Sequence, residues 1–243
     1  MKNCLNELVA HTQVLGNISF VKITGDQNTT AIETVSDDKA VILQGKYKEP
    51  VAEFVGVFGM PNLSKLSVIL NIPEYAEDAN ITVTTKKNDK EDVPSGLHFE
   101  NKGGDFKNDY RFMTSQIVNE KLKEITFRGA TWNVTVVPTI ASIQKFKFQS
   151  QANSDQPLFS VKTEKQDLKF YFGDAASHAG NFVFESNVTG SLTKAWNYPV
   201  KSVIDILGLV GDKKMMISDD GILKITVDSG LAEYDYLLPA HSK

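Results

Sequence analysis

The chain is poor in cysteine and has no long apolar run. Cys4 is its one cysteine among 243 residues, which excludes an intramolecular disulfide framework and favours a reducing compartment. No apolar run approaches the length that spans a bilayer, and the N-terminal residues lack the continuous apolar segment of a signal peptide. We therefore expect a protein of the cytoplasm, or of the host cell cytoplasm if it is viral, without membrane contact.

Catalytic and metal-binding motifs are also lacking. The sequence has no phosphate loop ending in Gly-Lys-Ser/Thr, no Gly-X-Ser-X-Gly turn and no His-Glu-X-X-His pair. The four histidines are scattered, none at metal-ligand spacing from another or from Cys4, and we expect them at surface or strand positions: His11, His98, His178 and His241. The sequence therefore predicts no enzyme, no metal and no cofactor.

The overall composition is that of a globular protein. Apolar residues make up 41% and charged residues 23%, which suits one large domain or two small ones. The formal net charge of −4 argues against a generally basic nucleic-acid coat but leaves room for a local basic face.

The end of the chain repeats a stretch from its middle. The segment Leu97–Met113 lies over Leu223–Pro239 at a constant offset, with apolar positions on apolar positions. Gly104 falls on Gly230, and Asp109-Tyr110 falls on Asp235-Tyr236. This pattern favours a duplication, with two copies of one domain of about 120 residues.

Hydrophobic periodicity predicts an α+β protein with many short strands and four helices. The expected helices are Asn3–Leu15, Pro61–Leu70, one from Thr139, and Pro199–Leu209. The expected strands are Ile18–Thr24, Thr30–Val35, Ala40–Tyr47, Ile81–Lys86, Gly96–Asn101, Asn108–Thr114, Trp132–Val137, Leu158–Thr163, Leu168–Phe172, Asn181–Val188, one near Met215, Leu223–Asp228 and Ala232–Leu238. Residues 115–124 are polar and are predicted to connect a first domain, 1–114, to a second, 125–243.

Two tandem copies of helix–strands–helix–strands resemble the DNA polymerase sliding clamps. The stretch from Ser218 to Ala240 is similar to the last hairpin of the trimeric clamps, and Thr34–Gln44 resembles a stretch of their first domain. The length and domain plan match the tailed-bacteriophage type best. The first half departs from the pattern because it lacks the leading strand that Trp132–Val137 supplies in the second.

The resemblance implies duplicated clamp domains with antiparallel sheets outside and two helices per domain on the inner face. Three chains would close head to tail into a homotrimeric ring around duplex DNA. Such a ring holds DNA topologically and independently of sequence, so that weak attraction to phosphates suffices. The function implied is that of a processivity factor for the replicative DNA polymerase, placed on DNA by an ATP-driven clamp loader.

A clamp of this kind needs cations on the helix faces that point away from the sheets. The residues expected to face DNA are Lys2, Lys65, Lys145, Lys201, Lys213 and Lys214. On the helix from Thr139 we expect Ile140, Ile143 and Phe146 to share the buried face, with Lys145 and Gln149 pointing away. On the last helix we expect Val203, Leu207 and Val210 to be buried together. The lysines also fit the ordinary solvated side of an amphipathic helix.

The resemblance further implies an apolar pocket for peptides of partner proteins. Carried over by position, this pocket would draw on Ala40, Val41, Ile42, Ile117, Val118, Tyr236, Leu237, Leu238, Pro239 and Ala240. The terminal run Leu237–Pro239 fits ordinary strand packing equally well. Ring closure would pair edge strands across subunits, and the candidates are Lys107–Met113 and Asn181–Val188.

Two other classes of protein remain open from the sequence. A β-rich phage structural protein of the tail or baseplate explains the strand content, the acidic charge and the missing motifs equally well. It explains less well why amphipathic helices occur at corresponding places in the two halves. An enzyme with an unrecognised site is the third class.

Overall fold

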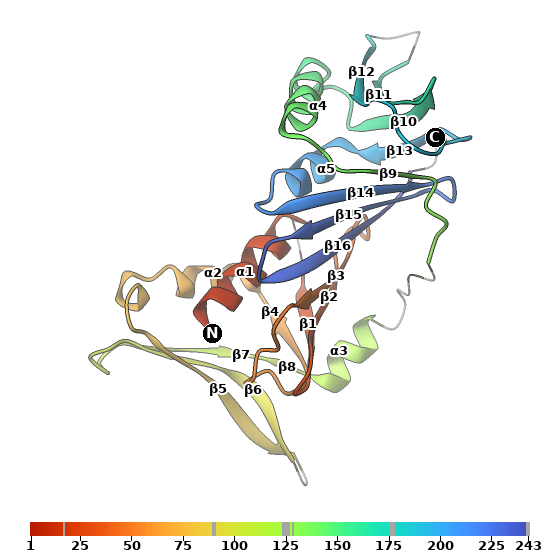
Figure 1. Cartoon of the computed structure of the whole chain (residues 1–243). Helices are drawn as coiled ribbons and strands as arrows, with labels where there is room; N and C mark the ends of the chain where they lie inside the picture. The colour runs from red at the N-terminus through yellow and green to blue at the C-terminus, as the bar shows by residue number, and fades with distance from the viewer. Residues whose placement is uncertain (17, 89–90, 123–126, 128, 175–177, 242–243) are drawn as a thin grey trace. The chain divides into compact units, whose positions relative to one another are not determined.

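The computed structural model describes residues 1–16, 18–88, 91–122, 127, 129–174 and 178–241 (Figure 1). The chain divides into two compact units. The first comprises Met1–Phe127 and Gly230–Tyr234, and the second comprises Arg128–Ser229 and Asp235–Lys243. The last strand, β16 (Ala232–Pro239), thus contributes residues to both.

The first unit contains two antiparallel sheets. One has the order β8-β4-β1-β2-β3, and the other has the order β5-β6-β7. Their strands are β1 (Phe20–Gly25), β2 (Thr30–Val35), β3 (Ile42–Tyr47), β4 (Gly56–Pro61), β5 (Asn80–Asn88), β6 (Glu91–Glu100), β7 (Lys107–Arg111) and β8 (Met113–Thr114). The sequence predicted all of these strands except β4, whose two glycines and terminal proline mask the strand pattern.

Two helices of the first unit, α1 (Lys2–Gln13) and α2 (Leu63–Leu70), lie side by side (Figure 1). On α1 the stripe of Leu5, Leu8, Val9 and Thr12, which recurs at helical spacing in the sequence, is buried. On α2 the corresponding stripe of Leu63, Leu66 and Leu70 is buried as well. Pro61 ends β4 and does not begin α2, whose N-cap is Asn62 with a left-handed backbone at φ 52°. The 3₁₀ turn η1 (Pro73–Tyr75) follows α2 and buries Tyr75. His11, expected at the surface, is 3% exposed and stacks on Tyr234 with ring centroids 4.1 Å apart.

The segment expected as a polar connector contains a helix, α3 (Ser115–Leu122), in its described part. Val118 is fully buried against Gly59 of β4, where an added Cβ would lie 2.5 Å from its Cγ2. Lys121 lies over the ring of Phe20 on β1, 5.7 Å from its centroid. The segment therefore packs on the first unit. Val118 fills the space that Gly59 leaves on the sheet, and the aliphatic stem of Lys121 covers Phe20 beside it.

The second unit repeats the combination of two antiparallel sheets with two helices (Figure 1). Its sheet orders are β12-β11-β10-β13 and β16-β15-β14-β9. The elements are β9 (Val134–Val136), α4 (Ile140–Ala152), β10 (Leu158–Glu164), β11 (Asp167–Phe172), β12 (Gly180–Glu185), β13 (Trp196–Pro199), α5 (Val200–Leu207), β14 (Asp212–Ser218) and β15 (Ile222–Asp228), followed by β16. The sequence prediction missed β13, a four-residue strand that ends in proline.

The predicted burial of the two helices in this unit is only partly right. On α5 the buried residues are Val200, Val203, Ile206 and Leu207, whereas Val210 lies beyond the helix and is 83% exposed. On α4 the buried residues are Ser142 and Phe146, and Ile140 is 82% exposed. The buried face of α4 is thus rotated from the one that its apolar residues predicted.

The internal repeat corresponds to two equivalent hairpins, β6–β7 and β15–β16. Both turns contain the aligned glycine at positive φ, 75° at Gly104 and 92° at Gly230. Each hairpin also carries the same cross-strand contact, because His98 Nδ1 lies 2.8 Å from Asp109 and Lys224 Nζ lies 3.0 Å from Asp235. Antiparallel sheets, a pair of helices in corresponding places of the two units (α1 and α2, α4 and α5) and this repeated hairpin confirm the predicted duplicated α+β fold, to which α3 is an addition in the first unit.

Candidate functional site

Two of the predicted DNA-facing lysines are exposed on the short helices. Lys65 is exposed on α2, opposite the buried Leu63, Leu66 and Leu70. The Lys201 side chain is 87% exposed on α5, and its Nζ lies 2.5 Å from Asp205 one turn later. Exposed i,i+4 ion pairs contribute little stability, so Lys201 can exchange this carboxylate for a phosphate at small cost.

Lys145 and Lys147 lie on different flanks of α4. Lys145 is exposed, whereas Gln149, its expected neighbour on the averted face, is half-buried. Gln149 Oε1 would lie 2.7 Å from a Cβ added to Gly180, so Gln149 lies against β12. Lys145 precedes Gln149 by four residues, so its Cα lies on the same side of the helix, and its side chain is exposed. The expectation that Gln149 points away from the sheet is therefore wrong, whereas Lys145 is exposed and its contact with DNA stays a prediction.

Two of the remaining three lysines occupy less open positions, and the third, Lys214, is exposed. Lys2 is half-buried, and its Nζ donates to the carbonyl of Tyr75, which joins the start of α1 to η1. Lys213 is half-buried and donates to Gly211 O at 2.8 Å, and burial lowers its pKa. Strand alternation puts Lys213 on the face of β14 that holds the buried Met215, and puts the exposed Lys214 on the opposite face.

Half of the predicted peptide-pocket residues belong to the core. Val41, Val118, Tyr236, Leu237 and Leu238 are each at most 1% exposed. The other five are accessible: in the first unit Ala40 and Ile42 are half-buried and Ile117 is 44% exposed, and in the second unit Pro239 is exposed and Ala240 half-buried. Buried side chains cannot act as peptide anchors unless the core opens, so the accessible five are the members that a partner could touch.

In the described part of the chain, each unit has one small sheet with one open edge and one protected edge. The β5 edge carries a register shift at Thr84/Thr85 and the exposed Lys86 and Lys87, all features that discourage pairing. The β13 edge is closed by the C-terminal segment, since His241 N donates to Asn197 O at 2.9 Å, and Pro199 has no N–H to offer. The opposite edges, β7 and β12, coincide with the predicted edge candidates. The β12 edge carries a register shift of its own against β11, between Leu168 and Lys169, but the pairs Phe170–Phe182 to Phe172–Gly180 before it are regular.

The backbone groups that these open edges present can be assigned from the register. Asn101 N donates to Phe106 O and Phe112 N to Ser95 O, so the even-numbered residues of β7 bond β6. Lys107, Asp109 and Arg111 therefore direct their N–H and C=O groups outward. On β12 the same alternation, counted from the two-residue turn between β10 and β11, leaves Asn181 and Val183 outward.

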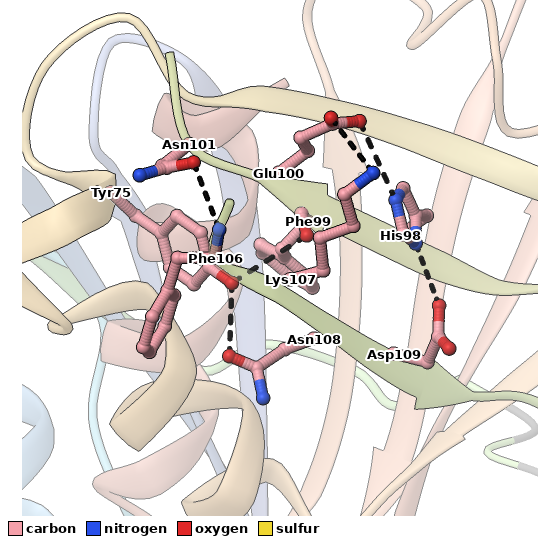
Figure 2. A network of polar contacts seen from close by, with 9 residues as sticks. All are labelled: Tyr75, His98, Phe99, Glu100, Asn101, Phe106, Lys107, Asn108 and Asp109. Carbon is pink, nitrogen blue, oxygen red and sulfur yellow. Dashed lines mark hydrogen bonds and ion pairs between the residues drawn. The ribbon is translucent and has the colours of Figure 1, made fainter. Parts of the chain in front are cut away.

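A polar network fixes the outer face of β7 (Figure 2). Lys107 Nζ lies 3.0 Å from Glu100, and His98 lies between Glu100 and Asp109. The hydrogen bond from Lys107 lowers the pKa of Glu100, and the one from His98 lowers the pKa of Asp109. On the other face Tyr75 Oη donates to Asn108 at 2.9 Å. Cross-strand contacts on both faces hold β7 against β6 and leave its far edge open.

The other face of β7 also contacts the start of α2. Tyr110 is 3% exposed, and its hydroxyl donates to the carbonyl of Pro61, just before the helix. Burial raises the pKa of the Tyr110 hydroxyl, which keeps it a neutral donor.

No group of three or more histidine, cysteine, aspartate or glutamate residues in the described part of the chain could hold a metal ion. Within the same residues, none of the helices has the length and apolar character that a membrane crossing requires.

Comparison with known proteins relates this geometry to one family. No family model matches the sequence, and no curated protein matches it. Among solved structures, PCNA of A. fulgidus, in a structure with the C-terminal region of FEN-1 bound, is similar with a TM-score of 0.72 and 9% identity, over 100% of this chain and 96% of that one. PCNA of Thermococcus kodakaraensis has a TM-score of 0.67 and 12% identity, over 99% and 97% of the two chains.

A third similar structure extends the comparison to a eukaryote. Proliferating cellular nuclear antigen of Entamoeba histolytica has a TM-score of 0.66 and 11% identity, over 99% of this chain and 96% of that one. The identities are too low to carry residue roles from one chain to another. The likeness spans both units, and this chain therefore has the fold of the PCNA-type sliding clamps along its whole length.

Proposed function

We propose that this protein is a DNA sliding clamp, in which three copies close head to tail into a ring around duplex DNA and tether the replicative polymerase. The observation that carries the proposal is the full-length likeness to PCNA, with a TM-score of 0.72. An ATP-driven loader would open the ring, and the chain itself would supply no nucleotide site.

The open edges support head-to-tail closure. In an antiparallel pair, hydrogen-bonded residues must both direct their backbone groups into the gap, and their side chains must share one face. Lys107, Asp109 and Arg111 satisfy both conditions toward Asn181 and Val183, because all five side chains point away from the helix side of their sheets. Phe182, between the latter two, faces the helices, since its ring centroid lies 6.2 Å from that of Phe146. Half of all randomly chosen pairs of edge strands would fail these conditions, because the residues that direct their backbone groups into the gap would have their side chains on opposite faces of the joined sheet.

The helices support DNA contact that is weak and independent of sequence. Lys65 and Lys201 are exposed on α2 and α5, and three copies would present each lysine three times around the ring. Lys145 and Lys214, which are exposed, are further proposed contacts, whereas Lys2 and Lys213 would act through their charge from half-buried positions. Topological retention does not require strong contacts, because a closed ring leaves DNA only by opening or by reaching an end.

The accessible pocket residues support client binding. The A. fulgidus PCNA structure holds the C-terminal region of FEN-1, and we propose that this chain likewise binds extended segments of its partners. Ile117 on α3 is the most exposed apolar candidate of the first unit, and Pro239 is the exposed candidate of the second.

The proposal can be tested by blocking the ends of linear DNA either before or after the protein is added. Protein would be added to linear duplex DNA with biotin at both ends, before or after streptavidin. A clamp threads over free ends and is then trapped, so only the first order should leave protein on DNA after a high-salt wash. Light scattering should give a mass three times 26.9 kDa. Salt-sensitive binding in either order, by a monomer, would contradict the clamp and favour the structural-protein alternative.

A further inference from the structure

The core-facing side of helix α1 buries a histidine and a carboxylate that the proposed function does not use. His11 is 3% exposed, and its Nε2 lies 3.3 Å from Glu7 Oε1, one helix turn earlier. That oxygen is buried and accepts no hydrogen bond within the described part of the chain. Ionisable side chains are seldom buried unless they are paired, because burial removes the water that stabilises a charge. The two side chains are therefore best treated as one pair.

The His11 ring lies flat on a tyrosine from the far end of the sequence. Tyr234 of β16 is fully buried, and its ring centroid lies 4.1 Å from that of His11, with the two planes 6° apart. Tyr234 in turn lies against Gly45 of β3, where an added Cβ would lie 2.8 Å from its Cδ1. The stack therefore ties the first helix to β16, the strand that contributes residues to both units.

Every titratable group that the described contacts bring to this stack is an acid. Helix α1 supplies Glu7 and Cys4, β16 supplies Tyr234, and β3 supplies Tyr47, whose hydroxyl donates to the carbonyl of Cys4 at 2.6 Å. Burial raises the pKa of the Tyr47 hydroxyl, which keeps it an uncharged donor. Helix α2 packs beside α1, and its one titratable residue, Lys65, is exposed on the face opposite to its buried stripe.

Three features of these surroundings favour the charged imidazolium form of His11. It lies in the last turn of α1, where the helix dipole attracts a cation. The Glu7 carboxylate attracts it, and the face of a stacked aromatic ring attracts it as well. Asp37, which lines the space beyond the end of α1, adds another carboxylate. Burial opposes the charge, but without it the buried oxygen of Glu7 would face no cation among the described contacts.

We propose that His11, paired with Glu7 and stacked on Tyr234, is a proton-dependent clasp that holds α1 on the strand shared by the two units. Loss of the proton removes the ion pair and the cation–π contact together. A group that is protonated preferentially in the folded state stabilises it at low pH, and this contribution is lost as the pH rises through its titration. Helix α1 and the first half of β16 should therefore loosen above about pH 6.5, where histidine ordinarily titrates. The clasp acts within a single chain and does not depend on the proposed ring.

Hydrogen exchange measured by mass spectrometry from about pH 6 to about pH 9 tests the clasp. We expect the protection of α1 and of Gly230–Tyr234, corrected for intrinsic exchange rates, to fall by roughly fivefold or more over this range. His11→Phe keeps a stacked ring that cannot be charged, and its protection should not change with pH. His98→Phe is the matched control, because His98 also contacts carboxylates but lies on β6, so α1 should keep its pH dependence.

A direct titration keeps the inference testable if His11→Phe fails to fold. In NMR spectra of the unaltered protein, His11 should keep its proton to a higher pH than the exposed His178, and Glu7→Gln should shift the His11 titration to lower pH. Protection of α1 that does not change with pH, or a His11 that loses its proton before His178, would overturn the clasp. A fall in protection that survives in His11→Phe would place the titrating group elsewhere and overturn it equally.

Discussion

Helices α4 and α5 belong to the same unit and contact each other, yet the sequence predicts the buried face of α5 better than that of α4. On α5 four apolar residues are buried together, and the predicted inner positions Val203 and Leu207 are among them. On α4 a serine is buried, and an isoleucine and a phenylalanine are exposed. The apolar residues of α5 share one stripe that faces the core, whereas those of α4 are spread around the helix, so its sequence does not show which face is buried. Four experiments sharpen this comparison.

The largest effect should come from the buried aromatic of α4. Phe146→Ala removes a fully buried ring that lies within 6.2 Å of Phe159, Phe170, Phe172 and Phe182. A cavity at such a site typically costs about 3–5 kcal/mol in the free energy of unfolding. Urea denaturation of dilute protein measures the decrease. Phe148→Ala, two residues away, should cost less than about 0.5 kcal/mol. Equal decreases at the two positions would contradict the assigned orientation of α4.

A smaller decrease in stability is expected for a buried residue of α5 (Val200–Leu207). Val203→Ala removes buried methyl groups, and the free energy of unfolding should fall by about 2 kcal/mol. Val210→Ala alters a side chain that is 83% exposed and should leave stability nearly unchanged. The same denaturation experiment measures both. A decrease at Val210 as large as at Val203 would mean that the stripe predicted from the sequence was right after all.

The lysines of the short helices should affect DNA retention and leave folding intact. Lys65→Glu with Lys201→Glu should weaken binding, and the slope of log affinity against log salt should fall by about one for each phosphate that the variant no longer neutralises. Polymerase stimulation and ring mass would be measured together. Lys102→Glu with Lys165→Glu makes the same charge change at exposed turns and serves as the control. Unchanged stimulation with an intact ring would remove α2 and α5 from the proposed DNA face.

The smallest effect concerns the network on β6 and β7. The pKa values of Glu100 and Asp109 are lowered in the folded protein, so the ionised carboxylates stabilise it at neutral pH. That contribution disappears as the pH falls below about 4, through the lowered pKa values. Asp109→Asn should therefore lower the melting temperature slightly at pH 7, and this deficit should shrink as the pH is lowered through the folded-state pKa of Asp109. Asp105→Asn, in the adjacent turn, is the control, and a deficit that persists in acid would argue against the ion pair.

Sequence reasoning succeeded where one local signal governs one element. Thr30–Val35 is a strand with the predicted bounds, and Thr139 caps α4 through a capping box with Ser142. The aligned glycines of the repeat both adopt positive φ, because each hairpin turn needs a backbone that other residues rarely adopt.

The failures occurred where a distant part of the chain supplies the partner. Residues 115–122 are polar in sequence, but Gly59 on a strand far away accepts Val118 and makes the segment a packed helix. His11 is buried because Tyr234, near the other end of the chain, stacks on it. The pocket residues Tyr236–Leu238 proved to be core, because alternation alone cannot say that both faces of their strand are covered.

The sequence by itself determined the α+β class, the internal repeat and most of the strands. These features depend on periodicity, on turn residues and on the length of short segments, all of which act between neighbours in the chain. The tertiary structure decided which edges stay open, which way α4 turns and which lysines are accessible. Those outcomes depend on contacts between residues far apart in sequence, such as His241 on β13 and Gln149 on Gly180, and no local pattern encodes them.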